Sequence, residues 1–371
     1  MIKRLLQSIL IVSILGAILA IWRWWHIRKN RVAAPNAQNL IAQPDTALSL
    51  IRHGDTLSIQ WQHPTQKADI YIGDAYRTLD ESTPTLQVEN RQVAMLHGID
   101  TEQRYQVMVK FADGTILQHM ERVLPFASAP NFRDIGGYQT QSGQVVRWNR
   151  VYRSSALDRL SPKDQVKLTQ LGIQTVCDVR TQEEHFADPD NLPDGMQSIS
   201  IAPSSDDNVL LAVIRLLFQQ GFLENLLADL YQRVMIQDNP QVFAAIFTRL
   251  AKDANLPMVI HCAAGKDRTG ITIALLLALL GVPDETIIAD YAFSNHYYDF
   301  FKHATRKNLA QLRIIGLTES DFDYLLIADG MMLQDTLHQV RTQYGSIDNY
   351  LIQYVGLSQG TLDNIRQNML I

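Results

Sequence analysis

The sequence predicts an α/β fold with a central, mostly parallel sheet flanked by helices, preceded by a small β-sandwich and one transmembrane helix. Three observations support this prediction: an uncharged apolar run at the N-terminus, a stretch of period-two alternation, and buried strands that alternate with helices towards the C-terminus. The chain has 371 residues. At roughly 150 residues per domain, that length accommodates two to three domains.

Composition excludes several classes of protein. Hydrophobic residues make up 46% and charged residues 19%, which excludes a collagen-like or wholly disordered chain. The formal charge of −5 excludes a globally basic nucleic-acid binder, so we expect no nucleic-acid partner. Only two cysteines, Cys177 and Cys262, are present, too few for a disulfide scaffold or a four-cysteine zinc site. We expect no metal and no other cofactor.

We interpret residues 1–31 as a membrane anchor. Leu5–Trp22 is an uncharged run of 18 residues, long enough for one spanning helix over about residues 5–25, and Trp24 and Trp25 suit the membrane interface. The alternative is a cleaved signal peptide. Basic residues after the run outnumber those before it, which by the positive-inside rule favours a cytoplasmic C-terminal body.

Residues 32–46 form a polar, proline-containing segment that we interpret as a linker. From 47 to 125 apolar residues alternate with polar ones, between turn signals rich in glycine and aspartate. The stretch Ile99–Tyr105 resembles the tyrosine corner of fibronectin type III domains. We therefore expect a fibronectin type III-like sandwich that serves as a spacer or interaction domain. The clearest alternations are Leu57, Ile59 and Trp61; Ile70 and Ile72; and Tyr105, Val107, Val109 and Phe111.

The sequence of residues 126–371 is typical of an α/β domain. Ser161 is a good N-cap and Pro162 fits the first helical position, so a helix begins there. Residues 172–180 and 256–261 read as short buried strands. Residues 271–282 are very apolar but too few to span a bilayer, which predicts a core helix.

The chemical centre of the sequence is the stretch His261–Gly270 (HCAAGKDRTG), which joins the second buried strand to that core helix. In a tight strand-to-helix turn the backbone N–H groups converge and the helix N-terminus adds positive charge, so a phosphate dianion fits there. Arg268 can hold two phosphate oxygens with its planar fork. Cys262 lies where the same field favours the thiolate, beneath a bound phosphoryl group and placed for in-line attack. Thr269 can donate its hydroxyl to the sulfur.

This Cys-x5-Arg signature resembles that of the cysteine-dependent phosphatases. Together with other motifs it resembles the bacterial atypical phosphatases, which act on phosphotyrosine and, in some members, on phosphoserine, phosphothreonine and phosphoinositides. The resemblance covers about residues 127–371 and implies a cysteine-phosphatase fold. Many members are exported, which favours an extracytoplasmic catalytic domain, against the charge bias. The other shared motifs are Asn131–Gly137, Tyr152–Ser155, Leu171–Ile173, Asp178–Arg180 with Glu184, Ala289–Tyr291 with Ser294–Asn295, and Tyr344–Ser346.

The resemblance also implies a general acid on a loop after a short strand, here Ser198–Pro203. Asp206 aligns best with the acid of the family. Asp207 and Asp267 remain open as alternatives for the acid. Asp206 and Asp207 could also cap the N-terminus of a helix. The residues expected to surround the phosphate are Ala263, Ala264, Gly265, Lys266, Asp267, Arg268 and Thr269.

Lys266 bears on the substrate. Lipid phosphatases resemble this sequence at that position, where a lysine at the rim of the site would meet a second phosphate on an inositol ring. The alternative is an exposed lysine without a role. The apolar stretch Val209–Val234 is interpreted as core packing or as a lid over the site.

Several other residues receive structural roles. We expect Arg133, Asp134 and Arg153 to brace the phosphate loop, and an ion pair of Arg180 with Glu184 to be structural. Cys177 lies in the other strand that runs towards the site. Related phosphatases sometimes carry there a cysteine that captures the oxidised nucleophile as a disulfide; the alternative for Cys177 is a buried, inert thiol.

The sequence therefore predicts a membrane-anchored, single-pass phosphatase. Its catalytic residues would be Cys262, Arg268 and Asp206 or Asp267, and its first expected substrate is phosphotyrosine on proteins. Two alternatives stay open: a phosphoinositide or inositol-phosphate phosphatase, and a catalytically weak phosphate-binding scaffold.

Overall fold

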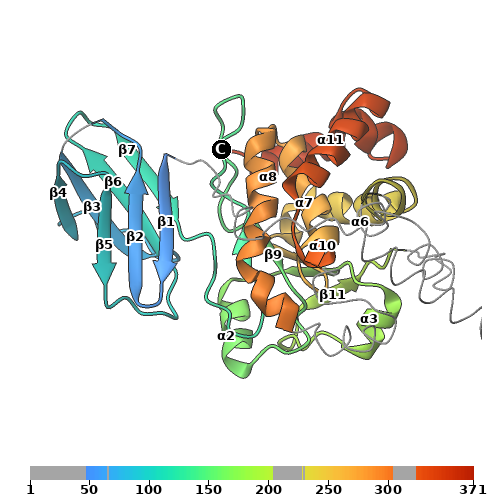
Figure 1. Ribbon diagram of the computed structural model, residues 1–371, viewed down its shortest axis with the longest axis horizontal. Coiled ribbons are helices and arrows are strands. Elements are labelled where there is room, and N and C mark those ends of the chain that lie inside the picture. Colours follow the sequence, from blue (N-terminus) through green and yellow to red (C-terminus); the bar gives the residue numbers. More distant parts are fainter. Residues whose placement is uncertain (1–46, 65–66, 204–227, 229, 304–322) are drawn as a thin grey trace, which may run out of the picture.

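The computed structural model describes residues 47–64, 67–203, 228, 230–303 and 323–371 (Figure 1). A β-sandwich lies beside a larger α/β part (Figure 1). In the described ranges, no helix has both the length and the apolar character needed to cross a membrane. The expected anchor and linker, residues 1–46, lie outside these ranges.

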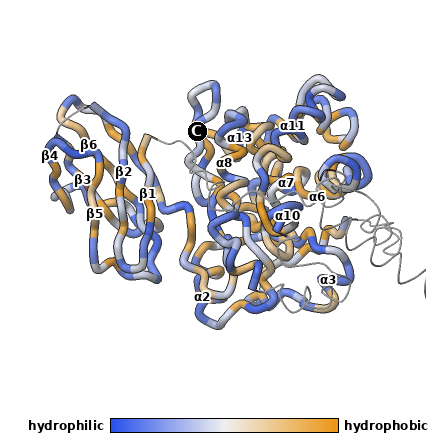
Figure 2. Tube along the Cα trace, viewed as in Figure 1, coloured by the Kyte–Doolittle hydropathy of each residue, from blue (hydrophilic) through white to orange (hydrophobic). Residues whose placement is uncertain are grey.

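The sandwich consists of two antiparallel sheets, in which hydrophobic and hydrophilic residues alternate along the strands (Figure 2). The alternation places Ile59, Ile70 and Val109 in one fully buried core, as expected for strands with one buried face. Trp61 is also buried and meets the ring of Phe111 edge-on at 6.3 Å. The three-stranded sheet has the order β1 (Leu48–His53), β2 (Thr56–Trp61), β5 (Val93–His97), and the four-stranded sheet the order β4 (Leu86–Glu89), β3 (Lys67–Asp74), β6 (Tyr105–Phe111), β7 (Ile116–Met120).

The predicted corner contact is present at the start of β6. The backbone N–H of Asp100 donates to the hydroxyl of Tyr105 at 3.0 Å. A tyrosine that bonds back to the backbone a few residues upstream fixes the corner between the two sheets.

The α/β part is built on a five-stranded sheet whose first four strands are parallel, with β8 antiparallel at one edge. The mostly parallel sheet predicted from the sequence is thus confirmed, and the chain is a mixed α/β protein. The central strand, β12, turns Val259 to one face and Met258 and Ile260 to the other, because successive side chains of a strand alternate. The strand order is β11 (Gln197–Ser200), β10 (Thr175–Asp178), β12 (Met258–His261), β9 (Val151–Ser154), β8 (Arg133–Asp134).

Helices cover both faces of this sheet. Leu168 of α2 packs on the face of Val259, and the larger core on the other face contains residues of α6, α7, α11 and α13. Ser161 caps α2 by accepting from the N–H of Asp164, and Pro162 is its first residue, as predicted. The apolar α7 is buried almost throughout. The helices are α2 (Pro162–Gln170), α3 (Gln182–Ala187), η2 (Leu230–Gln237), α6 (Pro240–Leu250), η3 (Asp253–Asn255), α7 (Asp267–Leu279), α8 (Asp284–Ala292), η4 (Phe293–Tyr297), α10 (Asp323–Leu326), α11 (Gly330–Tyr344), α12 (Ile347–Asn349), η7 (Tyr350–Tyr354) and α13 (Gln359–Met369).

A buried ion pair joins the sandwich to the α/β part. Arg104 donates to Asp134 at 2.9 Å, and both side chains are at most 1% exposed. Arg104 also donates to the carbonyl of Glu121 at 2.7 Å and to the side chain of Asn149 at 2.6 Å. Asp134 accepts further from the N–H groups of Gly136 and Asn149. A cation of the sandwich therefore neutralises a carboxylate in the first α/β strand.

Candidate active site

Cys262 lies at the carboxyl end of the central strand, where β12 ends at His261 and α7 begins at Asp267. Its side chain is buried at the base of the loop. Gly265 has φ +63°, and a Cβ there would lie 2.2 Å from the carbonyl oxygen of Ser154, so no other residue fits without displacing β9. The loop is thus pressed against the neighbouring strand in the strand–loop–helix arrangement that suits an anion.

The predicted phosphate-binding residues gather at one pocket. Ala263, Ala264, Lys266, Asp267 and Arg268 line a pocket of about 1010 Å³, and apolar walls are added by Phe300, Phe301 and Leu326. Behind the loop, the Thr269 side chain is fully buried, and its hydroxyl has no hydrogen-bond partner among the described residues. Such a free donor is what stabilisation of a sulfur leaving group requires.

Side chains from two other motifs hold the loop by its carbonyl groups. Asn131 donates from Nδ2 to the carbonyls of Ala264 and Gly265, both at 3.1 Å. Arg153 donates from Nη2 to the carbonyl of Gly265 at 2.8 Å. Because these carbonyl oxygens are bound on the side of Asn131 and Arg153, the N–H groups of the same peptide units point the opposite way and can bind an anion in the pocket.

A buried carboxylate anchors the arginines that brace the loop. Asp290 of α8 accepts from Arg133 Nε at 3.2 Å, Arg153 Nη1 at 2.6 Å and the Tyr138 hydroxyl at 2.9 Å. Burial alone would raise the pKa of Asp290, but Arg133 and Arg153 outweigh it and hold that pKa well below its usual value. Burial and the neighbouring Arg133 lower the pKa of Arg153 to about 10. Arg153 therefore braces the loop directly, as predicted, whereas Arg133 reaches it only through Asn131 and through Asp290, the acceptor that the two arginines share. Asp134, by contrast, binds Arg104 rather than the loop.

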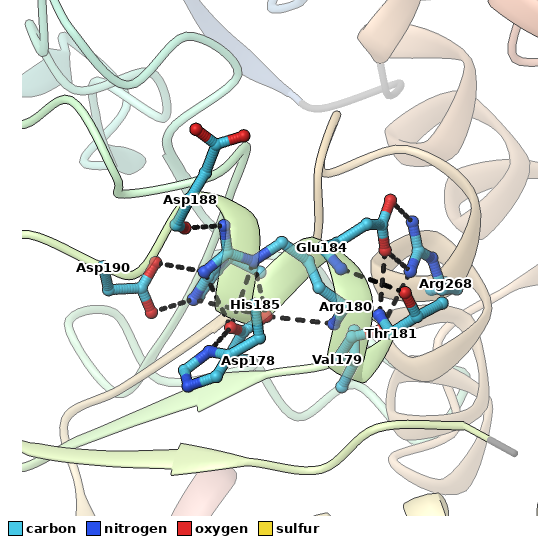
Figure 3. Close-up of polar contacts among 10 residues, drawn as sticks. Asp178, Val179, Arg180, Thr181, Glu184, His185, Asp188, Asp190 and Arg268 are labelled. Carbon is cyan, nitrogen blue, oxygen red and sulfur yellow. Dashed lines mark hydrogen bonds and ion pairs between the residues drawn. The ribbon is translucent and has the colours of Figure 1, made fainter.

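Arg268 is held by Glu184 (Figure 3). Arg268 donates from Nη1 and Nη2 to the two carboxylate oxygens at 2.5 and 2.9 Å, a bidentate pair. Glu184 is itself fixed by a capping box with Thr181 at the start of α3. Nη1 also donates to the carbonyl of Val179 at 3.4 Å. Three of the five N–H groups of Arg268 are thereby used, and two remain for a phosphate.

The expected ion pair of Arg180 with Glu184 is wrong. Arg180 instead binds Asp178 at 2.8 Å and Asp190 at 2.7 Å (Figure 3). The side chain of Arg180 folds back over its own strand, because Asp178, two residues earlier, accepts three of its hydrogen bonds. Glu184 is thus released to orient Arg268, and sequence spacing alone could not distinguish the two arginines.

The same cluster contains three potential metal ligands, Asp178, Asp190 and His261. Both carboxylates already bind the guanidinium of Arg180, and His261 Nε2 lies 3.0 Å from Asp190. The positive charge of Arg180 takes the place that a cation would need. We interpret the cluster as the support of the strand end that carries Cys262.

Lys266 was expected at the rim of the site or, in the alternative, as an exposed lysine without a role, and the structure instead buries its side chain. Its side chain is 3% exposed, and Nζ donates to Asp267 at 2.8 Å and to the carbonyl of Ile327 at 3.0 Å. Asp267 also accepts from the hydroxyls of Tyr231 and Tyr291. Lys266 is still among the residues that line the pocket, but part of its charge is offset by Asp267.

Several predicted features lie outside the described residues. Asp206 and Asp207 belong to the stretch 204–227, so the acid of the site stays a prediction. Of the stretch Val209–Val234, only 228 and 230–234 are described. Tyr231, in that short part, is buried in the larger core.

Cys177 is not placed to form a disulfide with Cys262 in this conformation. Cys177 pairs in register with Ile260, two residues before Cys262. With strands about 4.8 Å apart and a rise of about 3.3 Å per residue, the two Cα atoms lie roughly 8 Å apart, beyond the ~7 Å that a disulfide spans. Burial raises the pKa of Cys177 to about 12, and its sulfur faces Met258 at 3.7 Å. These features favour the inert thiol.

Sequence reasoning missed the acceptor role of Asp290 and the tether made by Asn295. Asn295 exchanges two hydrogen bonds with the backbone of Ala328, at 3.0 and 2.7 Å. It thereby fixes the segment whose Ile327 carbonyl accepts from Lys266. Asp290 and Asn295 both belong to a motif shared with the phosphatases. The motif singled out these two residues but did not predict which residues they contact.

Comparison with known proteins identifies the family of the chain. Residues 124–371 match the tyrosine phosphatase family. The chain belongs to that family, and it is a phosphatase. The match includes the sheet, the phosphate loop and the closing helices, and it begins where the sandwich ends.

Three curated relatives carry the same kind of name. A Cupriavidus necator protein named as a tyrosine-protein phosphatase is 29% identical over 62% of this chain and 82% of its own length. The triple specificity protein phosphatase PtpB of Mycobacterium tuberculosis is 29% identical over 67% of this chain and 99% of its own. A tyrosine-protein phosphatase of Nostoc commune is 34% identical over 40% of this chain and 49% of its own. Among solved structures, the catalytic core of a PP-IP phosphatase from S. cerevisiae covers 43% of this chain and 92% of its own, with 17% identity and a TM-score of only 0.24.

Proposed function

We propose that this phosphatase hydrolyses phosphate monoesters, phosphotyrosine on proteins first, through a phosphocysteine on Cys262. The observation that supports this most is the joint position of Cys262 and Arg268. Cys262 ends the central strand, Arg268 opens the following helix, and the loop between them has its carbonyl groups tied back by Asn131 and Arg153.

In the first step the Cys262 thiolate attacks phosphorus, the P–S bond forms, and the bond to the leaving oxygen breaks. We assign the proton that this oxygen takes up to Asp206, with Asp207 and Asp267 as alternatives. Loop N–H groups and the two free N–H groups of Arg268 would stabilise the equatorial oxygens. In the second step a water, deprotonated by the same carboxylate, attacks phosphorus and releases inorganic phosphate and the thiolate, assisted by the Thr269 hydroxyl.

The pocket favours an aromatic phosphate ester. Phe300, Phe301 and Leu326 give it an apolar side on which a phenyl ring can rest. Asp267 offsets part of the charge of Lys266, which weakens the case for a polyphosphorylated inositol. That second candidate still has a specific observation in its favour, because Lys266 lines the pocket and has a third N–H to donate.

The test compares turnover by the full chain of a phosphotyrosine peptide and of phosphatidylinositol phosphate in vesicles. We expect the peptide to be the better substrate, vanadate to inhibit, and Cys262→Ser to abolish turnover, while Cys177→Ala retains it. Higher turnover of the lipid would select the second candidate. Full activity in Cys262→Ser would refute the mechanism, and absence of activity in the unmodified chain would leave the phosphate-binding scaffold.

We propose further that the sandwich is a fibronectin type III-like module and that residues 1–31 anchor the chain with its catalytic part outside the cytoplasm. The three-plus-four arrangement of strands and the hydrogen bond from Asp100 to Tyr105 support the first assignment. The apolar run Leu5–Trp22 supports the second. A reporter fused to the C-terminus that is active only outside the cytoplasm would test the orientation, and a reporter active only in the cytoplasm would reverse it.

A further inference from the structure

Two buried arginines connect the sandwich to the α/β part, and both lie outside residues 124–371, which match the family. Arg104 directly precedes β6, and Arg122 follows β7 by two residues. Arg104 donates to the side chain of Asp134 at 2.9 Å. Arg122 donates to the backbone carbonyls of Asp134 and Gly136, at 3.0 and 2.7 Å. The sandwich thus holds β8 and the turn after it by both side chain and backbone.

The segment that joins the two modules adds backbone contacts to the same strand. Val123 pairs antiparallel with Arg133 of β8. The N–H of Asp134 donates to the carbonyl of Arg122 at 2.9 Å. Because β8 has only two residues, fewer than strands usually have, its position depends on these contacts as well as on its pairing with β9.

From β8 the contacts lead on to the phosphate loop. Arg133 donates from Nη1 to the side-chain oxygen of Asn131. Asn131 in turn donates to the carbonyls of Ala264 and Gly265, both at 3.1 Å. Asn131 has φ +64°, in a sparsely populated region of backbone conformations that persists where surrounding contacts fix it. Buried contacts therefore run continuously from the sandwich to the peptide groups of the phosphate loop.

We propose that the sandwich is a supporting part of the active site, and that Arg104 and Arg122 are positioning residues for the reaction at Cys262. They act through β8 and Asn131, because neither arginine lines the pocket at the loop. A misplacement of about 1 Å can cost roughly a hundredfold in rate, so loosening this support should weaken anion binding and catalysis in protein that is still folded. The proposal rests on the hydrolysis proposed for Cys262.

The test uses the full chain in detergent micelles, at a temperature where circular dichroism shows folded protein. Vanadate binding to the loop is measured by titration calorimetry, and turnover is measured with 4-nitrophenyl phosphate. Arg104→Met should raise the dissociation constant of vanadate at least tenfold, raise KM and lower kcat, and Arg104→Lys, which keeps the charge, should restore part of each. A role in stability alone would lower the active fraction and the apparent kcat, but it would leave KM and the vanadate affinity of folded molecules unchanged.

The matched control is Glu102→Gln. Glu102 lies in the sandwich at the same interface, where it pairs with Lys163 at 3.1 Å and with Lys167, both of α2, but it is 43% exposed. This variant should bind vanadate and turn over the ester within twofold of the unmodified chain. A loss equal to that of Arg104→Met would show that the interface as a whole, and not the route through β8, supports the loop, and it would overturn the proposal.

The route itself is tested in Asn131→Gly, which tolerates the positive φ and removes the side chain that reaches the loop. Adding Arg104→Met to this variant should change vanadate binding less than threefold, because coupled residues are not additive. Arg122→Met keeps the test decisive should Arg104→Met unfold, since Arg122 forms no ion pair with a carboxylate in the described ranges. Arg122→Met should raise the vanadate dissociation constant at least threefold.

Unchanged vanadate binding in folded Arg104→Met or Arg122→Met would overturn the proposal, as would a full tenfold effect of Arg104→Met in the Asn131→Gly variant. Should the unmodified chain bind vanadate but hydrolyse no ester, the proposed function fails, and the binding measurements still decide whether the sandwich supports the loop. Absence of vanadate binding by the unmodified chain would overturn both.

Discussion

Replacing Asp290 by asparagine should destabilise the phosphatase far more than its isosteric shape suggests. The carboxylate is 1% exposed and is shared by Arg133 and Arg153, whose side chains are fully buried. Asparagine keeps the size and one acceptor but removes the negative charge, which leaves two buried guanidinium groups without a counter-ion. Breaking a buried ion pair in this way costs about 3–5 kcal/mol, a large share of the ~5–15 kcal/mol that typically stabilises a domain.

The assay is urea unfolding of Asp290→Asn beside a matched control, Asp284→Asn. Asp284 lies on the same helix, and it pairs with Arg341 at 2.5 and 2.7 Å but is 36% exposed. Exposed pairs contribute about 0–1 kcal/mol, so the control should unfold close to the unmodified chain. A loss below about 1 kcal/mol in Asp290→Asn, or equal losses in the two variants, would refute the role assigned to this cluster.

The same variant makes a pH prediction. Although burial acts to raise the pKa of Asp290, the arginines hold it well below the ordinary carboxyl value, which is about 3.9 in an unfolded chain. A lowered pKa in the folded state adds stability above the unfolded pKa and loses it as the pH falls towards the folded pKa. The difference in unfolding free energy between the unmodified chain and Asp290→Asn should therefore be constant above about pH 5 and should narrow below about pH 4. A difference that widens with acid would contradict this assignment.

Two further predictions concern positioning residues. Glu184→Gln should loosen the guanidinium of Arg268 and lower kcat/KM for an aryl phosphate about tenfold, equivalent to ~1.4 kcal/mol. Glu184→Asp should restore part of this loss, and the control Glu183→Gln, at the neighbouring exposed position, should have little effect. Unchanged kinetics in Glu184→Gln would show that the bidentate pair has no role in catalysis. Arg104→Met should leave Asp134 buried without a counter-charge and lower the free energy of unfolding by about 3–5 kcal/mol. Differential scanning calorimetry measures this loss as a lower melting temperature. An unchanged melting temperature would show that the ion pair between the sandwich and the α/β part does not stabilise the fold.

The sequence predicted features that depend on local spacing. The cap at Ser161, the strand that ends at His261, and the corner at Tyr105 each follow from residues within a few positions of one another, and each is present. The phosphate loop belongs to the same class, because its glycine, cysteine and arginine are contiguous. Its function could be inferred before any tertiary contact was known.

The sequence could not predict the contacts that depend on how the helices and strands pack together. Arg180 and Glu184 are four residues apart, and only the turn into α3 decides that Glu184 reaches Arg268, far away in the sequence. Asp290 carries no signal of the two arginines it binds, which lie more than a hundred residues earlier. The buried state of Lys266 depends on a carbonyl from a third segment, that of Ile327. Each contact is set by how elements dock, and residue type alone leaves it open.

The mechanism rests on a covalent phosphocysteine, and rapid quenching during turnover of an aryl phosphate tests it most directly. Peptide mass spectrometry of the quenched enzyme should find the phosphoryl group on Cys262 in the unmodified chain. The adduct should disappear in Cys262→Ser together with turnover. A phosphoryl group on another residue, or undiminished turnover in Cys262→Ser, would contradict the account.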